Sequence, residues 1–165
     1  MTLPFLVWPL LALSLASALL AGVFLTFSDF LMRALQRSSP ASGTEVMQTL
    51  NREVYRSVFM LLFLGMVPVS VLSGGFGLLR IQGPSGDWLA AAALLYLLGV
   101  FGVTAAGNVP MNQRLDAMPL AGAEAQAYWP VYAGGWLRWN HLRSVAALGV
   151  SACYAVAALL VAAGG

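Results

Sequence analysis

The sequence predicts an all-α membrane protein: one domain over residues 1–165 that folds as a bundle of four transmembrane helices. Two observations predict it. The chain is 60% hydrophobic and only 8% charged, whereas soluble domains carry about 25% charged residues. The charged residues also fall into three bands, and the stretches between and beyond the bands are long enough to cross a bilayer as helices.

The uncharged stretches are residues 1–28, 57–79, 88–113 and 144–165. Each exceeds the roughly 20 residues that a helix needs to cross the hydrocarbon core. Backbone groups in lipid must pair within their own segment, so each stretch is expected to be helical. We expect the spans at approximately residues 5–28, 54–74, 88–108 and 142–163. The first span lacks the basic start of a signal peptide, so we expect it to be retained.

The arginines predict the orientation. Four spans place the first and third charge bands on one membrane face and both termini on the other. Seven of the eight arginines lie on the first face, and only Arg80 lies on the second. The positive-inside rule then places the arginine-rich face in the cytoplasm and both termini outside. The arginine- and alanine-rich composition is typical of a bacterial protein, so we expect the bacterial inner membrane. The net charge of +2 does not suggest nucleic-acid binding.

Local motifs refine the helix boundaries. Residues 42–45 (Ser-Gly-Thr-Glu) match a capping box, which predicts a helix from about Thr44 that continues into the second span. Pro68 predicts a kink in that helix, and Gly74-Gly75 predicts its end.

The third span has two boundary signals of its own. Asp87 follows a turn sequence and is expected to cap the helix. Pro110 disfavours helical geometry at the residue before it, so we expect a break or bend beside Asn108.

Polar residues gather at the arginine-rich end of every span. Asp29 closes the first span. Gln48, Asn51 and Tyr55 are spaced i, i+3 and i+7, on one face of the helix that leads into the second span, and Glu53 lies beside them.

The third and fourth spans continue this pattern. Asn108 and Asn112 are spaced i, i+4 at the end of the third. A stripe on the last helix carries Tyr132, Trp136, Asn140 and Arg143, with Trp139 and His141 adjacent. Polar groups inside a membrane bundle need partners and are functional candidates, so we expect one shared polar pocket.

Each of these residues also has a structural interpretation. Trp129, Trp136 and Trp139 are compatible with an interfacial aromatic belt, and the asparagines with interhelical hydrogen bonds. Asp29 and Glu53 have arginines nearby with which to pair. A lone His141 more often makes a structural hydrogen bond than binds a metal. The remaining acidic residues of this face are expected to be solvated loop charges: Glu45, Asp116 and Glu124.

Four segments together resemble the anthrone oxygenase-like family of small four-helix membrane proteins. They are residues 22–28 with Met32, residues 47–51, Val103-Thr104 with residues 108–112, and the run from Trp129 to Arg143. Their order and spacing extend the resemblance from about residue 10 to about residue 160.

The resemblance implies an oxygenase-like function. Members of the family oxidise an anthrone to an anthraquinone with molecular oxygen and without a bound cofactor. The chain would thus act on a lipophilic polycyclic aromatic of the anthrone or quinol type, by deprotonation and direct reaction with oxygen. No cofactor is predicted. A metal or haem site stays open, with His141 and Glu53 as weak metal candidates.

The polar residues can be assigned roles in such chemistry. Amide and guanidinium donors would stabilise the enolate oxygen, and His141 has a suitable pKa for a general base; Asp29 or Glu53 would serve if desolvated. The expected catalytic residues are His141, Asn140, Arg143, Asn108 and Asn112. The expected substrate-binding residues are Asn51, Gln48, Tyr55, Tyr132, Trp136, Trp139 and Asp29.

Two other functions are compatible with the sequence. One is a non-enzymatic binder or carrier of a lipophilic small molecule such as a quinone, and the other is an accessory membrane subunit. Few polar residues lie in the outer halves of the spans, which argues against an ion channel. Small residues such as Gly99 and Gly22 permit close helix packing, either within one chain or in a homo-oligomer.

Overall fold

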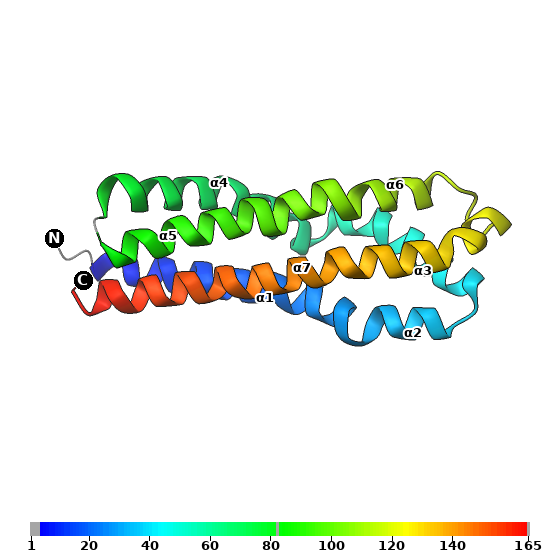
Figure 1. The fold of residues 1–165 in the computed structure, drawn as a ribbon, viewed down its shortest axis with the longest axis horizontal. Coiled ribbons are helices and arrows are strands. Elements are labelled where there is room, and N and C mark those ends of the chain that lie inside the picture. Colours follow the sequence, from blue (N-terminus) through cyan, green and yellow to red (C-terminus); the bar gives the residue numbers. More distant parts are fainter. Residues whose placement is uncertain (1–3, 82, 165) are drawn as a thin grey trace.

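The computed structural model describes residues 4–81 and 83–164, and within them five continuous helical runs form an elongated bundle (Figure 1). The first run joins a short 3-10 turn (Pro4–Leu6), α1 (Val7–Thr26), the π-helical turn η2 (Phe27–Leu31) and α2 (Met32–Arg37). The second joins α3 (Pro40–Glu53) and the 3-10 turn η3 (Val54–Arg56). The third is α4 (Val58–Arg80). The fourth joins α5 (Pro84–Leu94), the π-helical segments η4 (Leu95–Gly102) and η5 (Thr104–Asn108), and α6 (Val109–Asp116). The fifth is α7 (Ala123–Ala162).

Four of these runs are long and apolar enough to cross a membrane: Val7–Arg37, Val58–Arg80, Pro84–Asp116 and Ala123–Ala162. The prediction of an all-helical fold with four candidate membrane spans is therefore confirmed. The start of the first run and the end of α7 lie at the same end of the bundle, beside the turn from α4 to α5 (Figure 1).

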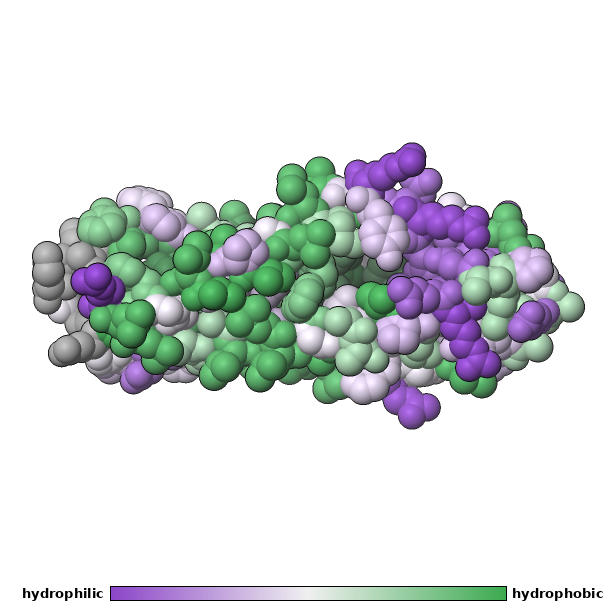
Figure 2. Space-filling view, turned by 90° about the horizontal axis from the view of Figure 1, so that it is seen from above, coloured by the Kyte–Doolittle hydropathy of each residue, from purple (hydrophilic) through white to green (hydrophobic). Residues whose placement is uncertain are grey.

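The bundle is longer than a bilayer is thick. At about 1.5 Å per residue, the 23-residue α4 spans roughly the 30 Å of the hydrocarbon core. The 40-residue α7 is about 60 Å long and continues well beyond it. We call the part alongside α4 the membrane half, and the part that holds α2, α3, α6 and the start of α7 the polar half. Figure 2 shows apolar side chains over most of the membrane half and hydrophilic side chains concentrated in the polar half.

The membrane half has a core of aliphatic and aromatic side chains that includes Leu20, Tyr96 and Tyr154. Small residues let its helices approach closely. A Cβ on Gly99 would lie 2.7 Å from the Cβ of Ala146 in α7, so this contact is made within one chain. Nothing lies within 4 Å of a Cβ on Gly22, and homo-oligomer formation stays a prediction.

The polar half has a second core, in which α3 and α6 pack against the start of α7. Met47, Leu115 and Tyr132 are fully buried in it. The Trp129 ring packs on Gly43, where a Cβ would lie 2.7 Å from the ring atoms. A glycine at this position lets α3 approach α7.

The prediction of one helix that begins near Thr44 and continues into the membrane is wrong at both ends. α3 begins at Pro40, and its N-cap is Ser39, whose Oγ accepts from the backbone N–H of Ser42 at 3.2 Å. A proline at the first helical position needs no hydrogen-bond partner for its nitrogen, which favours this earlier start. The helix also does not continue into the membrane, because Ser57 is extended (ψ 155°) and caps a new helix, α4.

Three further boundary predictions differ from the structure. α4 passes through Gly74-Gly75 and ends at Arg80, since Gly74 allows close packing: a Cβ there would lie 2.5 Å from the Cβ of Ala93. The helix does not break beside Asn108. It continues through the π-helical segment η5, which ends at Asn108, and Pro110 lies in the first turn of α6. Asp87 is not the cap of α5 but lies in its first turn, where its charge favours the helix N-terminus.

Candidate functional site

The stripe predicted on the last helix is buried in α7 along its whole length. Tyr132 and Asn140 have no exposed surface, and Trp136 and Arg143 are 5% and 6% exposed. These four residues lie around the junction of the polar half with the membrane half, and they organise the candidate site.

Asn140 ties α7 to the end of α1. Its Nδ2 donates to the carbonyl oxygen of Phe24 at 2.7 Å and to the Ser28 hydroxyl at 2.8 Å. Its Oδ1 accepts from Nη2 of Arg143 at 2.7 Å. Both hydrogens and the oxygen of the amide therefore have partners, and the amide fixes the position of the guanidinium.

Arg143 lies between aromatic rings. The centre of its guanidinium is 4.6 Å from the ring centroid of Phe24 and 5.1 Å from that of Trp136. Its Nη1 makes a long 3.5 Å contact with the Thr104 hydroxyl, and its buried Nε has no hydrogen-bond partner. Among the described residues, the one ion pair joins Arg33 to Asp29, so Arg143 has no carboxylate partner there. Arg143 is a buried cation held in place by neutral groups.

Asn112 lies on the other side of Trp136. Its Oδ1 accepts from the Tyr132 hydroxyl and from Nε1 of Trp136, both at 2.9 Å. Because an indole N–H can only donate, the amide atom that faces it must be the oxygen. The Tyr132 hydroxyl therefore also donates to Asn112, and one amide fixes two rings.

Asn108 is the second amide of this helix. Its Nδ2 donates to the Trp136 carbonyl at 3.1 Å, while its Oδ1 is buried without a partner. The junction thus holds one unpartnered donor, Nε of Arg143, and one unpartnered acceptor. Buried polar atoms are nearly always paired in proteins, so two such atoms at one level are a sign of a ligand site.

The π-helical turns lie at this same level. η2 carries Ser28 and η5 begins at Thr104, and both hydroxyls contact the Asn140–Arg143 pair. π-Helical turns are often found at functional sites. Sequence reasoning named neither residue as a site residue, although both lie in the segments that carry the family resemblance.

Two predicted residues of α3 reach the polar half. Gln48 uses its whole amide to hold the loop after α6: Nε2 donates to the carbonyls of Leu115 and Met118, and Oε1 accepts from the N–H of Ala121. Asn51 is 6% exposed and its Nδ2 has no partner with normal hydrogen-bond geometry.

Asp116 is a further candidate for this site, although from the sequence we expected it to be a loop charge. It lies beside Asn51 and interacts electrostatically with Tyr132, which also interacts with Arg143. Its Oδ1 is buried without a partner of normal hydrogen-bond geometry, while the residue as a whole is half-buried and also interacts electrostatically with Arg52. The signal was present in the spacing, because Asn108, Asn112 and Asp116 are separated by four residues each and share one helix face.

Other predicted residues do not join this cluster. His141, Glu53 and Asp29 are exposed, and Asp29 forms its ion pair with Arg33 at 3.3 Å. Tyr55 is 64% exposed. Trp139 is 40% exposed and covers Gly107, where a Cβ would lie 2.5 Å from its ring. Within residues 4–81 and 83–164, no three His, Cys, Asp or Glu side chains group in a way that could hold a metal ion.

The comparisons with known proteins assign the chain to a family. No curated protein and no solved structure matches the chain. A model of the anthrone oxygenase family matches residues 54–153, a range that contains Thr104, Asn108, Asn112 and the α7 stripe. This range is more than half of the 165 residues, so the chain belongs to the anthrone oxygenase family.

Proposed function

We propose that the chain is a membrane-embedded oxygenase that acts on a lipophilic polycyclic aromatic of the anthrone or quinol type. The observation that carries this proposal is the buried guanidinium of Arg143, which has aromatic rings beside it and no carboxylate partner among the described residues. Family membership supports the same reaction class.

An anionic substrate would supply the negatively charged partner that Arg143 lacks among the described residues. Burying an unpaired cation destabilises a protein by several kcal/mol, so such a cation is expected to have a functional reason. Loss of a proton from the methylene group of an anthrone gives an enolate whose charge lies largely on oxygen. The guanidinium, oriented by Asn140, would bind that oxygen, and fixed donors of this kind are usually the largest contribution to catalysis.

The surroundings of Arg143 suit a flat polycyclic ring. Phe24 and Trp136 contact the guanidinium, and Phe27 lies 5.2 Å from Trp136 between ring centroids. Aromatic faces bind planar rings by stacking. They also keep water from the enolate, which strengthens its attraction to Arg143.

We assign the proton-accepting role to Asp116. The three residues expected to supply a base, His141, Asp29 and Glu53, are exposed. Asp116 interacts with Tyr132, which in turn interacts with Arg143. A proton from the substrate would thus end on this carboxylate, which lies at the end of α6 and interacts electrostatically with Tyr132.

The overall reaction balances without a further reactant. The enolate gives an electron to molecular oxygen, and the methylene carbon then becomes a carbonyl. One oxygen atom of O2 enters that carbonyl, and the other leaves as water with the two hydrogens of the methylene group. The products are an anthraquinone and water.

Oxygen uptake with anthrone, in vesicles with and without the protein, tests this function. We expect the protein to accelerate uptake, one O2 per anthraquinone formed. Arg143→Met should lower kcat/KM by about a hundredfold or more, the loss typical of a removed oxyanion donor. Arg138→Met is the matched control, because Arg138 is exposed on the same helix. Uptake no faster than in protein-free vesicles, or equal rates for both variants, would contradict the proposal.

A second candidate is a non-enzymatic binder or carrier of a quinone, because the same guanidinium would donate to a quinone carbonyl. Tight quinone binding without oxygen uptake would favour it. The third, an accessory subunit, would be favoured by a protein that copurifies at a fixed ratio.

We further propose that the polar half lies in the cytoplasm and both termini outside, in a bacterial inner membrane. Seven of the eight arginines belong to the polar half or its junction, and Arg80 lies at the opposite end. The positive-inside rule supports this orientation. Cysteine labelling from each side of spheroplasts, at Ser38 and at Gly83, would test it.

A further inference from the structure

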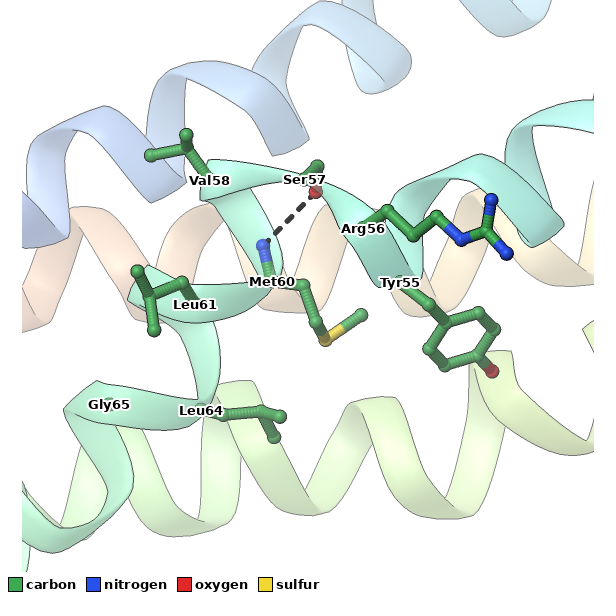
Figure 3. A pocket seen from close by; sticks show the side chains of 8 residues that line it. All are labelled: Tyr55, Arg56, Ser57, Val58, Met60, Leu61, Leu64 and Gly65. Carbon is green, nitrogen blue, oxygen red and sulfur yellow. Dashed lines mark hydrogen bonds between the residues drawn. The ribbon is translucent and has the colours of Figure 1, made fainter.

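A groove lies on the outer surface of the bundle where α3 ends and α4 begins. Its volume is about 510 Å³ and it is lined by eight residues between Tyr55 and Gly65 (Figure 3). Sites for small ligands usually have volumes of roughly 300 to 1,000 Å³. In Figure 3 the side chains of Tyr55, Met60 and Leu64 extend to the same side of this segment. The groove is therefore apolar along α4 and polar at its other end, where Tyr55 and Arg56 lie.

The break at Ser57 makes the groove. Its extended backbone separates η3 from α4, and its Oγ caps α4 by accepting from the N–H of Met60 at 3.2 Å (Figure 3). At the far end, Gly65 leaves open space, because nothing lies within 4 Å of a Cβ built there. A single unbroken helix over these residues would not have this shape.

The groove opens where the membrane half meets the polar half. Val58, the first residue of α4 and of its candidate membrane span, is 80% exposed, and Leu61 is 75% exposed. Exposed aliphatic side chains at this level of a membrane protein face lipid. A molecule dissolved in the bilayer would thus reach the groove without crossing water.

Behind the groove, packed aromatic rings join its segment to Arg143. The ring centroid of Phe59, which follows Val58 at the start of α4, lies 5.6 Å from that of Phe24. The centre of the Arg143 guanidinium lies 4.6 Å from the same Phe24 centroid.

We propose that this groove is an access site, in which a planar lipophilic aromatic binds from the bilayer before it passes Phe59 and reaches Arg143. The groove is large enough for a three-ring molecule, and its apolar wall along α4 can pack against the rings. Tyr55 and Arg56 can donate hydrogen bonds to the oxygen atoms of the molecule. The occupant is the substrate of the proposed function, so the identity of the molecule rests on that proposal. The rings of Phe59 and Phe24 must move to let it pass.

Two glycines of α4 provide a matched test. Gly65 lines the groove and Gly75 does not, yet nothing lies within 4 Å of a Cβ at either position. Alizarin, a hydroxyanthraquinone, is added to protein in phosphatidylcholine vesicles, and its induced circular dichroism is followed by rapid mixing, because an achiral dye shows this signal only when a protein holds it. We expect Gly65→Phe to slow the signal about tenfold, because the added ring would occupy part of the groove. Gly75→Phe should match the wild type.

A second variant covers the case in which Gly65→Phe does not fold. Met60→Ala widens the groove and should speed the appearance of the signal. Unchanged rates in both groove variants, an equal slowing in Gly75→Phe, or no induced signal in the wild type would overturn the access site.

Oxygen uptake with anthrone on the same preparations separates the two proposals. If the protein shows no oxygen uptake with anthrone, and only Gly65→Phe slows the alizarin signal, the oxygenase proposal is wrong and the access site is supported. Normal uptake, together with equal alizarin rates in the two glycine variants, supports the oxygenase and overturns the access site.

Discussion

The membrane half and its junction with the polar half bury polar groups in different ways. In the membrane half, the polar links between helices are neutral hydroxyls: Ser14 with Ser151, Ser73 with Tyr154, and Tyr96 with the Phe63 carbonyl. The junction instead buries a cation and two amides. Nε of Arg143 and Oδ1 of Asn108 are unpartnered there, whereas the unpartnered atom of α4 is a neutral hydroxyl, that of Ser70. Hydroxyl links are sufficient to hold helices together. The buried charge at the junction is therefore better explained by function than by folding.

After Arg143 itself, the largest effect should come from Asn140, and the adjacent His141 is its control. Asn140→Ala leaves Nη2 of Arg143 without its acceptor and removes two donors. Hydrogen bonds to charged groups contribute about 1.5 to 3 kcal/mol, so kcat/KM with anthrone should fall by about ten- to a hundredfold. His141→Ala changes an exposed side chain and should leave the rate nearly unchanged. Equal losses of kcat/KM in Asn140→Ala and His141→Ala would contradict the different roles that we assign to these two residues.

In the membrane half, the effects should be on stability alone. Gly74→Val places a Cβ that would start 2.5 Å from the Cβ of Ala93, and overpacking of this kind costs about 1 to 3 kcal/mol. Gly75→Val adds its side chain to open space and should be close to neutral. Unfolding in mixed micelles by added SDS measures both free energies. A stable Gly74→Val variant would mean that the contact between α4 and α5 is looser than described.

Asp116 tests whether the junction extends to the end of α6. Asp116→Asn removes the proposed proton acceptor and should lower the rate of anthrone oxidation by about tenfold, below the hundredfold typical of a base that contacts its substrate. Glu124→Gln is the control, since Glu124 is an exposed carboxylate at the start of α7. The rate is measured by oxygen uptake, and alizarin affinity should be unchanged. If Asp116→Asn retains full activity, another group accepts the proton.

The smallest effect is expected for a hydroxyl of the membrane half. Tyr154→Phe removes the 2.8 Å link to Ser73 and should lower the free energy of unfolding by about 0.6 kcal/mol, the mean for polar links between membrane helices. Anthrone oxidation should not change. A large loss of activity would show that the two regions are coupled.

The sequence predicts that there are four long apolar helices, because lipid excludes charge and the positions of Asp, Glu and Arg separate these helices. It also predicts the α7 stripe, because the four residues recur at helical spacing. His141 was grouped with the stripe by adjacency, but consecutive residues on a helix point about 100° apart, and it lies outside.

The remaining differences come from tertiary packing. Tyr55 shares a helix face with Asn51 only if the helix is regular, and the 3-10 turn and the break at Ser57 change its direction. Gly74 looked like a helix end because its role depends on Ala93, which is 19 residues away. Asp116 was expected to be a loop charge because no local pattern reveals that it lies beside Asn51 of α3. Such contacts between distant segments are not visible in a single sequence.

The binding of alizarin across a range of pH tests the central claim most directly, because the claim is that Arg143 holds the anionic form of an aromatic substrate. In the wild type, the pH at which bound alizarin becomes its phenolate should lie at least about 1 unit below that of alizarin in protein-free vesicles, the shift expected beside one cation. In Arg143→Met this shift should disappear, while Arg138→Met should keep it. An equal shift in the wild type and in Arg143→Met would contradict the account.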